Sequence, residues 1–299
     1  MFTGFLAAAV RVATPLLLAA TGETIGQRGG VINLGVEGAM LVGALAATIG
    51  ATVDGNTTGI LAAILAGTSV AAVFALVSVV AGADQIITGT AVTLGAIGVS
   101  GTAYRRFFGP EGAGLELVTL PAIDLPLLGR IPILGPALFA QPILTYIALA
   151  AVPLAWWLLF RTRWGLALRA AGESLEAAKA SGVRVIVVRV TATMIGGAFS
   201  GLAGASLVLA QVGTFAEQMT AGRGFVAIAI VVLGRWHPFG VAVSALLFGA
   251  ASASQFMFQA MNFQVPYQFF LMLPYLLTIL ALAGAVGRVT APNELGKQY

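Results

Sequence analysis

Residues 141–160 read QPILTYIALAAVPLAWWLLF and contain no charged side chain. An α-helix needs about 20 consecutive apolar residues to cross the hydrocarbon core of a bilayer, and this run has that length. Backbone groups in lipid must bond internally, so only helices and closed barrels span a membrane. The run is continuous and lacks the alternation of a barrel strand, which favours a transmembrane helix.

Similar runs recur along the whole chain. Gly, Pro and short charged segments separate them, and no stretch has the composition of a soluble domain or a linker. We therefore expect an all-α polytopic membrane protein with residues 1–299 in a single transmembrane domain. The expected number of spans is about nine, within a range of eight to ten, because the seventh is short for a full crossing. The candidate spans fall at about 4–21, 34–53, 58–82, 86–104, 141–160, 185–210, 224–236, 239–259 and 266–287.

The composition excludes several functional classes. Hydrophobic residues make up 59% of the chain and charged residues 9%, and the mean hydropathy is +0.98. A soluble fold could not hide that much apolar surface. The sequence pI of about 9.9 does not indicate nucleic-acid binding, because the formal charge is only +4 and the basic residues sit in short loops. With no cysteine and one histidine, the chain predicts no metal site and no cofactor.

Loop charges predict the orientation in the membrane. Residues 161–189 hold six Arg or Lys residues against two Glu residues, whereas residues 105–140 hold three residues of each sign. Cytoplasmic loops carry the excess of Lys and Arg, so the first loop is expected inside and the second outside. Counting spans from there places the C-terminus in the cytoplasm and, with nine spans, the N-terminus outside.

The basic loop carries its own local signals. Residues 161–182 read RTRWGLALRAAGESLEAAKASG. Ser174 is a suitable N-cap, Glu176 suits the positive end of a helix, and Gly182 suits the left-handed residue beyond its last turn. These features predict a short cytoplasmic helix of about two turns whose small side chains allow close approach by another protein.

Glu176, Ala177 and Ala178, followed by Gly182, resemble the EAA-x-x-x-G coupling motif of ABC importer permeases. The resemblance implies that the loop 161–184 docks into a groove of an ATP-binding subunit and transmits its closure to the membrane helices. A plain amphipathic helix that covers lipid headgroups is the alternative interpretation.

A second informative stretch, residues 22–44, reads GETIGQRGGVINLGVEGAMLVGA. Its glycines are expected to interrupt a regular helix. Asn33 and Glu37 are four residues apart, so we expect them on one helix face. An ionisable residue at this depth usually faces the bundle interior or a wet cavity. Glu37 is therefore either a residue that lines the path or braces a gate, or a structural carboxylate bonded to backbone N–H groups or to Arg28.

The GVINLGVEG run strongly resembles the permeases of nucleoside and simple-sugar ABC importers, and residues 13–20, 83–91 and 222–240 agree with the same family in order. The resemblance implies the type II, vitamin-importer-like fold in a bacterial inner membrane. It also implies three kinds of partner: a second homologous permease, ATP-binding subunits inside, and a substrate-binding lipoprotein outside. The residues of the motif favour nucleosides as the substrate, with simple sugars or branched-chain amino acids as alternatives.

The span at 86–104 begins beside further polar residues. Asp84 and Gln85 are expected either to cap that helix or to seal a cytoplasmic gate. With Thr88 they complete the set of candidate path or gate residues, which also includes Asn33 and Glu37.

The chain contains no Gly-Lys-Ser/Thr phosphate loop, so we expect ATP to be hydrolysed by a separate subunit. The sequence also contains no recognisable set of catalytic residues, which predicts a transport subunit and not an enzyme. An ion-coupled secondary transporter is a further alternative. In such a protein Glu37 would be the coupling residue beside a broken helix.

Overall fold

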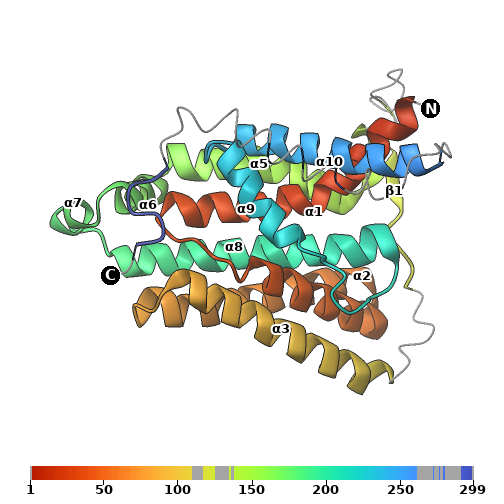
Figure 1. Ribbon diagram of the computed structural model, residues 1–299, viewed down its shortest axis with the longest axis horizontal. Helices are drawn as coiled ribbons and strands as arrows, with labels where there is room; N and C mark the ends of the chain where they lie inside the picture. The colour runs from red at the N-terminus through yellow and green to blue at the C-terminus, as the bar shows by residue number, and fades with distance from the viewer. Residues whose placement is uncertain are drawn as a thin grey trace.

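The computed structural model describes residues 2–109, 117–124, 138–260 and 291–297, together with the single positions 135, 272, 276 and 279. The described part is a bundle of long helices with one small two-stranded ribbon (Figure 1). The α-helices are α1 (Phe2–Arg28), α2 (Val36–Ala75), α3 (Gln85–Phe108), α5 (Ile143–Arg161), α6 (Arg163–Glu173), α7 (Leu175–Ala180), α8 (Val185–Leu207), α9 (Arg223–Leu233) and α10 (Pro238–Ala260). Two π-helical turns, η1 (Leu76–Val80) and η2 (Val208–Val212), extend α2 and α8, and the strands are β1 (Ala122–Asp124) and β2 (Ala140–Pro142).

Within the described residues, six helices are long and apolar enough to cross a membrane. One of these, Val36–Val80, is broken by non-helical backbone at Asp54 and Gly55, and its two arms correspond to the predicted spans 34–53 and 58–82. The predicted span 224–236 matches α9, whose 11 residues give a length of about 16 Å, about half a crossing. The predicted span 266–287 lies outside the described residues, so the count of nine stays a prediction.

Helix α2 folds back on itself and packs against α8. A methyl group at Gly50 would come within 2.8 Å of the Cα of Gly59, so the two arms are in close contact near the turn. On α8, a methyl group at Gly201 would overlap the carbonyl oxygen of Ala63 in the second arm, and Gly43 of the first arm faces the same glycine. Among the described helices, α2 and α8 form the most extensive pair. Small residues allow this approach, which matters because the hydrophobic effect does not drive helices together in lipid.

Helix α1 runs through the middle of the remaining helices and contacts α5, α8, α9 and α10. Its segment Leu16–Ala20 is almost completely buried, in one cluster with side chains of α2, α8 and α10. Helix α9 crosses obliquely over this layer (Figure 1). The bundle therefore surrounds α1 on several sides, which places the carboxyl end of α1 inside the structure.

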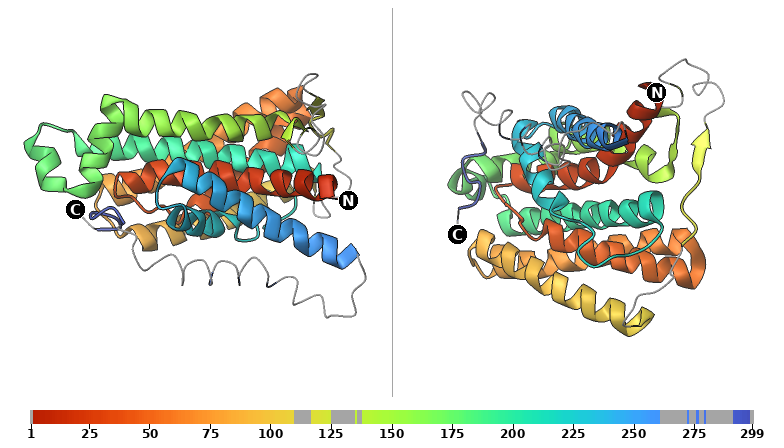
Figure 2. Two further views of the ribbon diagram at one scale, coloured as in Figure 1. Left: turned by 90° about the horizontal axis from the view of Figure 1, so that it is seen from above. Right: turned by 45° about the vertical axis from the view of Figure 1, so that its right-hand side comes forward.

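The two ends of the bundle differ. The N-terminus and the ribbon lie at one end, and α6, α7 and the C-terminal segment lie at the other in all views (Figures 1 and 2). The predicted loop 105–140 contributes β1, which pairs antiparallel with β2, while the backbone N–H of Leu120 donates to the carbonyl of Leu209 at 2.7 Å. The described part of this loop therefore packs on the bundle.

Candidate transport site and coupling loop

The backbone between α1 and α2 is not helical over residues 29–35. Gly30 has a φ of +90°, which side-chain-bearing residues rarely adopt. The side-chain oxygen of Asn33 accepts a hydrogen bond from the Gly35 N–H at 2.9 Å and closes a local turn. The expectation that Asn33 and Glu37 share a helix face is wrong. Helix α2 begins at Val36, and Asn33 lies before it in the non-helical segment 29–35, called the break below.

Glu37 lies in the first turn of α2 and is buried. One of its carboxylate oxygens accepts a hydrogen bond from the Gly222 N–H at 2.8 Å, and the other accepts one from the Gly224 N–H at 2.6 Å. Gly222 is the N-cap of α9, so a single carboxylate binds the free N–H groups at the start of a second helix. The negative charge also suits the positive ends of both helices, which meet at this point.

Backbone N–H groups were among the partners that the sequence allowed for Glu37, and Arg28 was the other. Arg28 instead donates from Nε to the carbonyl oxygen of Trp236 at 2.7 Å. Glu37 therefore ties two discontinuous helices together inside the bundle. Broken helices at membrane depth occur where they are buried in protein or line a cavity, so this arrangement is compatible with a gate.

Helix α3 begins beside the break. Asp84 accepts hydrogen bonds from the N–H groups of Ile86 and Ile87, both at 2.9 Å, which confirms the capping interpretation. Gln85 is buried, and its side-chain oxygen accepts a hydrogen bond from the Ile32 N–H at 2.7 Å. Thr88 is also buried in this first turn of α3. The structure thus brings Gln85 to the break, while Asp84 caps the helix end nearby.

The loop between α5 and α8 forms two helices. The short helix predicted from Ser174 is α7, and the Ser174 side chain accepts a hydrogen bond from the Ala177 N–H at 3.3 Å. Gly182 follows with a φ of +78°, as its place beyond the helix predicted. Within α7, which is described in full, only Ala178 is buried, so Glu176 and Ala177 are exposed. Three residues of the motif that resembles a coupling helix, Glu176, Ala177 and Gly182, are therefore exposed at one end of the bundle, while Ala178 packs inward against α6 and α8.

Helix α6, which precedes α7, was not predicted. The Thr162 side chain caps it by accepting a hydrogen bond from the Gly165 N–H at 3.0 Å. The signal was present in the sequence, because Thr is a favoured N-cap residue and Leu166, Leu168 and Ala170 are good helix formers.

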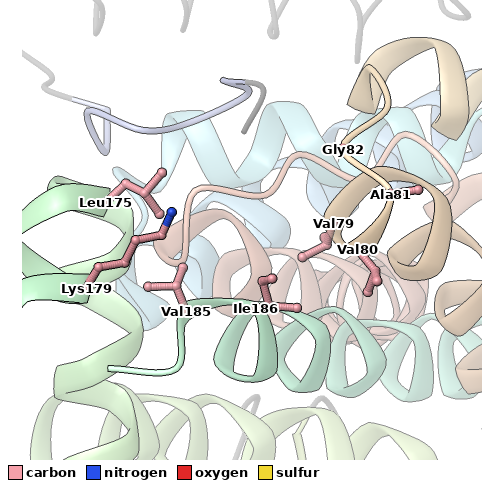
Figure 3. A pocket seen from close by; sticks show the side chains of 8 residues that line it. All are labelled: Val79, Val80, Ala81, Gly82, Leu175, Lys179, Val185 and Ile186. Atoms are coloured by element: carbon pink, nitrogen blue, oxygen red, sulfur yellow. The ribbon is translucent and has the colours of Figure 1, made fainter. Parts of the chain in front are cut away.

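A groove of about 230 Å³ lies between α7 and residues 79–82 (Figure 3). Leu175 and Lys179 of α7 lie on one side of it, residues 79–82 before α3 lie on the other, and Val185 and Ile186 lie between them. Among the described residues that line it, Lys179 is the one that carries a charge. The groove therefore leaves α7 without tight packing against the turn that leads into α3.

Sequence reasoning missed a buried polar chain at the same end of the bundle. Gln27 donates to a carboxylate oxygen of Glu23 at 3.4 Å and accepts a hydrogen bond from the indole N–H of Trp236 at 2.8 Å. All three side chains are buried. The signal that could have found them is an acidic residue and an amide four residues apart directly after the predicted span 4–21, since polar residues at membrane depth usually pair within the bundle.

The chain is 40% identical over 264 residues to a putative glucose ABC transporter permease of Haloferax volcanii, covering 87% of this chain and 79% of that one. It is 34% identical to the guanosine ABC transporter permease of Bacillus subtilis and 33% identical to a nucleoside ABC transporter permease of Lactococcus lactis, each over 96% of this chain and 93% of the relative. No solved structure matches. Residues 5–282 match the family model for the permease component of the branched-chain amino acid transport system, and the chain therefore belongs to that family.

Proposed function

We propose that this chain is the membrane-spanning permease subunit of an ATP-driven ABC importer for nucleosides and forms half of the translocation path. The observation that carries the proposal is α7, a capped helix with the coupling-type residues Glu176, Ala177, Ala178 and Gly182, all of them exposed except Ala178. A helix that protrudes with small exposed side chains suits insertion into a groove of an ATP-binding subunit. Family membership and the three ABC permease relatives support the same assignment.

Nucleosides are the substrate class that we favour. Two relatives named for guanosine or nucleosides match nearly the full length of the chain, and the GVINLGVEG run contains the buried Glu37 at the junction of α2 and α9. A simple sugar is the second candidate, because the putative glucose permease has the higher identity of 40%. None of the three relatives is named as an ion-coupled transporter, and we assign Glu37 no ion.

The finer architecture belongs to the same proposal. We propose a type II permease fold of about nine spans in a single domain of residues 1–299, placed in a bacterial inner membrane. The α6–α7 end would face the cytoplasm with the C-terminus, and the N-terminal end would face outward, as the loop charges indicate. A second homologous permease, ATP-binding subunits and an external substrate-binding lipoprotein would complete the transporter.

The proposed chemistry of the permease is conformational. Closure of the ATP-binding subunits would displace α7 and shift the permease pair between inward-open and outward-open states, while ATP would be hydrolysed by the partner subunit. A ligand moves such an equilibrium only through its different affinity for the two states. Asn33, Glu37, Gln85 and Thr88 are the proposed path or gate residues, since they lie at the break and the start of α3, and Asp84 contributes by capping that helix.

Purification of the tagged chain in mild detergent, with identification of its partners, tests the assignment first. Recovery of an ATP-binding subunit and a second permease is the expected result. Uptake into proteoliposomes then decides the substrate, with labelled guanosine and labelled glucose compared at equal concentration. ATP-dependent uptake of guanosine but not glucose supports the nucleoside proposal, and the reverse preference selects the sugar. A chain that purifies alone and transports without the ATPase contradicts the importer assignment.

A further inference from the structure

The C-terminal segment 291–297 lies at the α6–α7 end of the bundle (Figures 1 and 2). Its residues 293 and 294 form hydrogen bonds with the end of α6. The Glu294 N–H donates to the carbonyl oxygen of Gly172 at 2.9 Å, and the Asn293 side-chain amide donates to the carboxylate of Glu173 at 3.2 Å. Gly172 and Glu173 are the last residues of α6, so the segment is attached to the base of α7.

The other end of the segment reaches the candidate gate. The Gly296 N–H donates to the carbonyl oxygen of Gly30 in the break at 3.2 Å. The Gln85 side-chain amide donates to the carbonyl oxygen of Lys297 at 3.3 Å, while its oxygen holds the Ile32 N–H. The same glutamine therefore binds the C-terminal segment and the break, at the start of α3.

A buried arginine lies under this crossing. Arg189 of α8 donates from its guanidinium to the carbonyl oxygen of Ala171 in α6 at 2.8 Å. A Cβ atom at Gly30 would come within 2.8 Å of that guanidinium, so the break passes directly over it. The carbonyl oxygen of Glu294 would lie 3.1 Å from the same Cβ atom, so the C-terminal segment passes here too. The end of α6, the break and the C-terminal segment thus meet around one fixed cation.

Among the described residues, no hydrogen bond links the other side of α7 to the start of α3. The groove in Figure 3 leaves about 230 Å³ between α7 and residues 79–82, which lead into α3. Helix α6 does touch the end of α1 through Gly172, which packs against the carbonyl of Arg28. The start of α3, however, is hydrogen bonded to the segment 291–297 and not to α7 in the described residues.

We propose that residues 291–297 form a coupling strap that carries displacement of α6 and α7 to the break at 29–35 and to the start of α3. The proposal rests on the proposed function, because it needs an ATP-binding subunit that moves α7. The strap is attached by hydrogen bonds at both ends, so it moves with α6 and pulls on Gly30 and Gln85 together. Its loss should separate ATP hydrolysis from transport without removing the docking surface on α7.

The test uses the complete transporter in proteoliposomes and measures the amount of substrate taken up per ATP hydrolysed. A chain that ends at residue 291 should still assemble and hydrolyse ATP, while this ratio falls about tenfold, within the usual range of coupling between sites. Lys297→Ala is the matched control. It removes only the exposed ion pair with Glu294 at 3.4 Å and leaves the backbone carbonyl that Gln85 binds, so the ratio should not change.

A cross-link provides a second test that does not shorten the chain. The protein has no cysteine, so Glu173→Cys with Asn293→Cys gives one defined pair at side chains that already touch. Joining them should preserve the ratio, because the strap and α6 move together. The two single-cysteine variants under the same oxidising conditions are the controls.

Three results are decisive. A shortened chain with the wild-type ratio overturns the strap, and so does a cross-link that blocks transport until a reductant is added. If the shortened chain does not assemble, the cross-linked pair decides alone. A wild-type transporter without any ATP-dependent uptake instead contradicts the proposed function, so the two failures are distinguishable.

Discussion

The carboxylate oxygen Oε2 of Glu37 lies 2.6 Å from the backbone nitrogen of Gly224. This bond joins the first turn of α2 to the first turn of α9. A second hydrogen bond, from the Gly222 N–H to the other carboxylate oxygen, joins the same two helix starts. The two helices begin inside the bundle at a shared carboxylate, which makes their relative position depend on one side chain.

Replacing Glu37 with Gln should therefore loosen both helix starts. Gln keeps one oxygen acceptor but presents an amide N–H₂ to a backbone N–H, so one bond is lost and the charge with it. Hydrogen bonds to charged groups are worth about 1.5–3 kcal/mol, and the free energy of unfolding in detergent should fall by about that amount. We also expect ATP-dependent uptake to be lost.

Glu217→Gln is the control for that change. Glu217 pairs with Arg105 at 3.0 Å, with about half of each side chain exposed. Exposed ion pairs contribute about 0–1 kcal/mol, so this variant should stay close to wild type. Equal losses of stability in the two variants would show that the position of Glu37 has no special importance.

A double variant in α7 tests the coupling helix. Glu176→Arg reverses the charge in the first turn of α7, and Gly182→Trp places a bulky side chain where φ is +78°. Both positions lie outside the membrane spans, so insertion should be normal while ATP no longer drives uptake. Arg184→Ala, at an exposed position of the same loop, should transport normally. Normal ATP-dependent uptake by the double variant would contradict the assignment of α7 as a coupling helix.

Gly201 and Gly98 both lie in apolar helical segments, but replacing them with Ala should change the stability of the protein differently. Gly201→Ala should lower the free energy of unfolding by about 1–3 kcal/mol, because its methyl group would overlap the Ala63 carbonyl and force the α2 arm outward. Gly98→Ala on α3 meets nothing within 4 Å and should be neutral or stabilising by up to about 1 kcal/mol. Titration of the isolated subunit with SDS compares the two, and the same loss at both sites would contradict the packing described here.

The single histidine predicts a pH effect on stability. His237 lies in the turn before α10, and burial, with the nearby Arg28 charge second, lowers its pKa below the ordinary value. The unfolded chain therefore binds a proton more readily than the folded one, so stability is lost as the pH falls through the ordinary histidine pKa of about 6.5. Wild type should lose more stability than His237→Gln between about pH 8 and about pH 5 in thermal unfolding. Parallel curves would show that His237 is not responsible.

Local signals in the sequence predicted local structure well. Ser174 and Gly182 act within a few residues of one another, and both ends of α7 fall where they indicated. The long apolar runs likewise predicted α5, α8 and α10, because span length and hydrophobicity alone define a membrane helix.

The arrangement of the candidate site was less accessible from the sequence. Regular spacing placed Asn33 on the same helix face as Glu37, but the chain unwinds before Val36 because Ile32 and Asn33 find hydrogen-bond partners outside a helix. The partners of Glu37 are backbone N–H groups in a distant segment. Every residue except proline has such a group, so the sequence does not show which of them a side chain will bind. The strap contacts of Asn293 with Glu173 are equally remote in the chain.

The separation between Glu37 and Gly224, 187 positions along the chain, has a consequence for biogenesis. When α2 enters the membrane during synthesis, the segment that will bind its carboxylate has not yet been made. An acidic side chain without partners is costly in the hydrocarbon core. We therefore expect the first arm of α2 to stay near the membrane interface, or to pack its carboxylate against other protein, until α9 has been synthesised. On this account the helix that begins at Val36 reaches its final position late in assembly, although it is among the first to be translated.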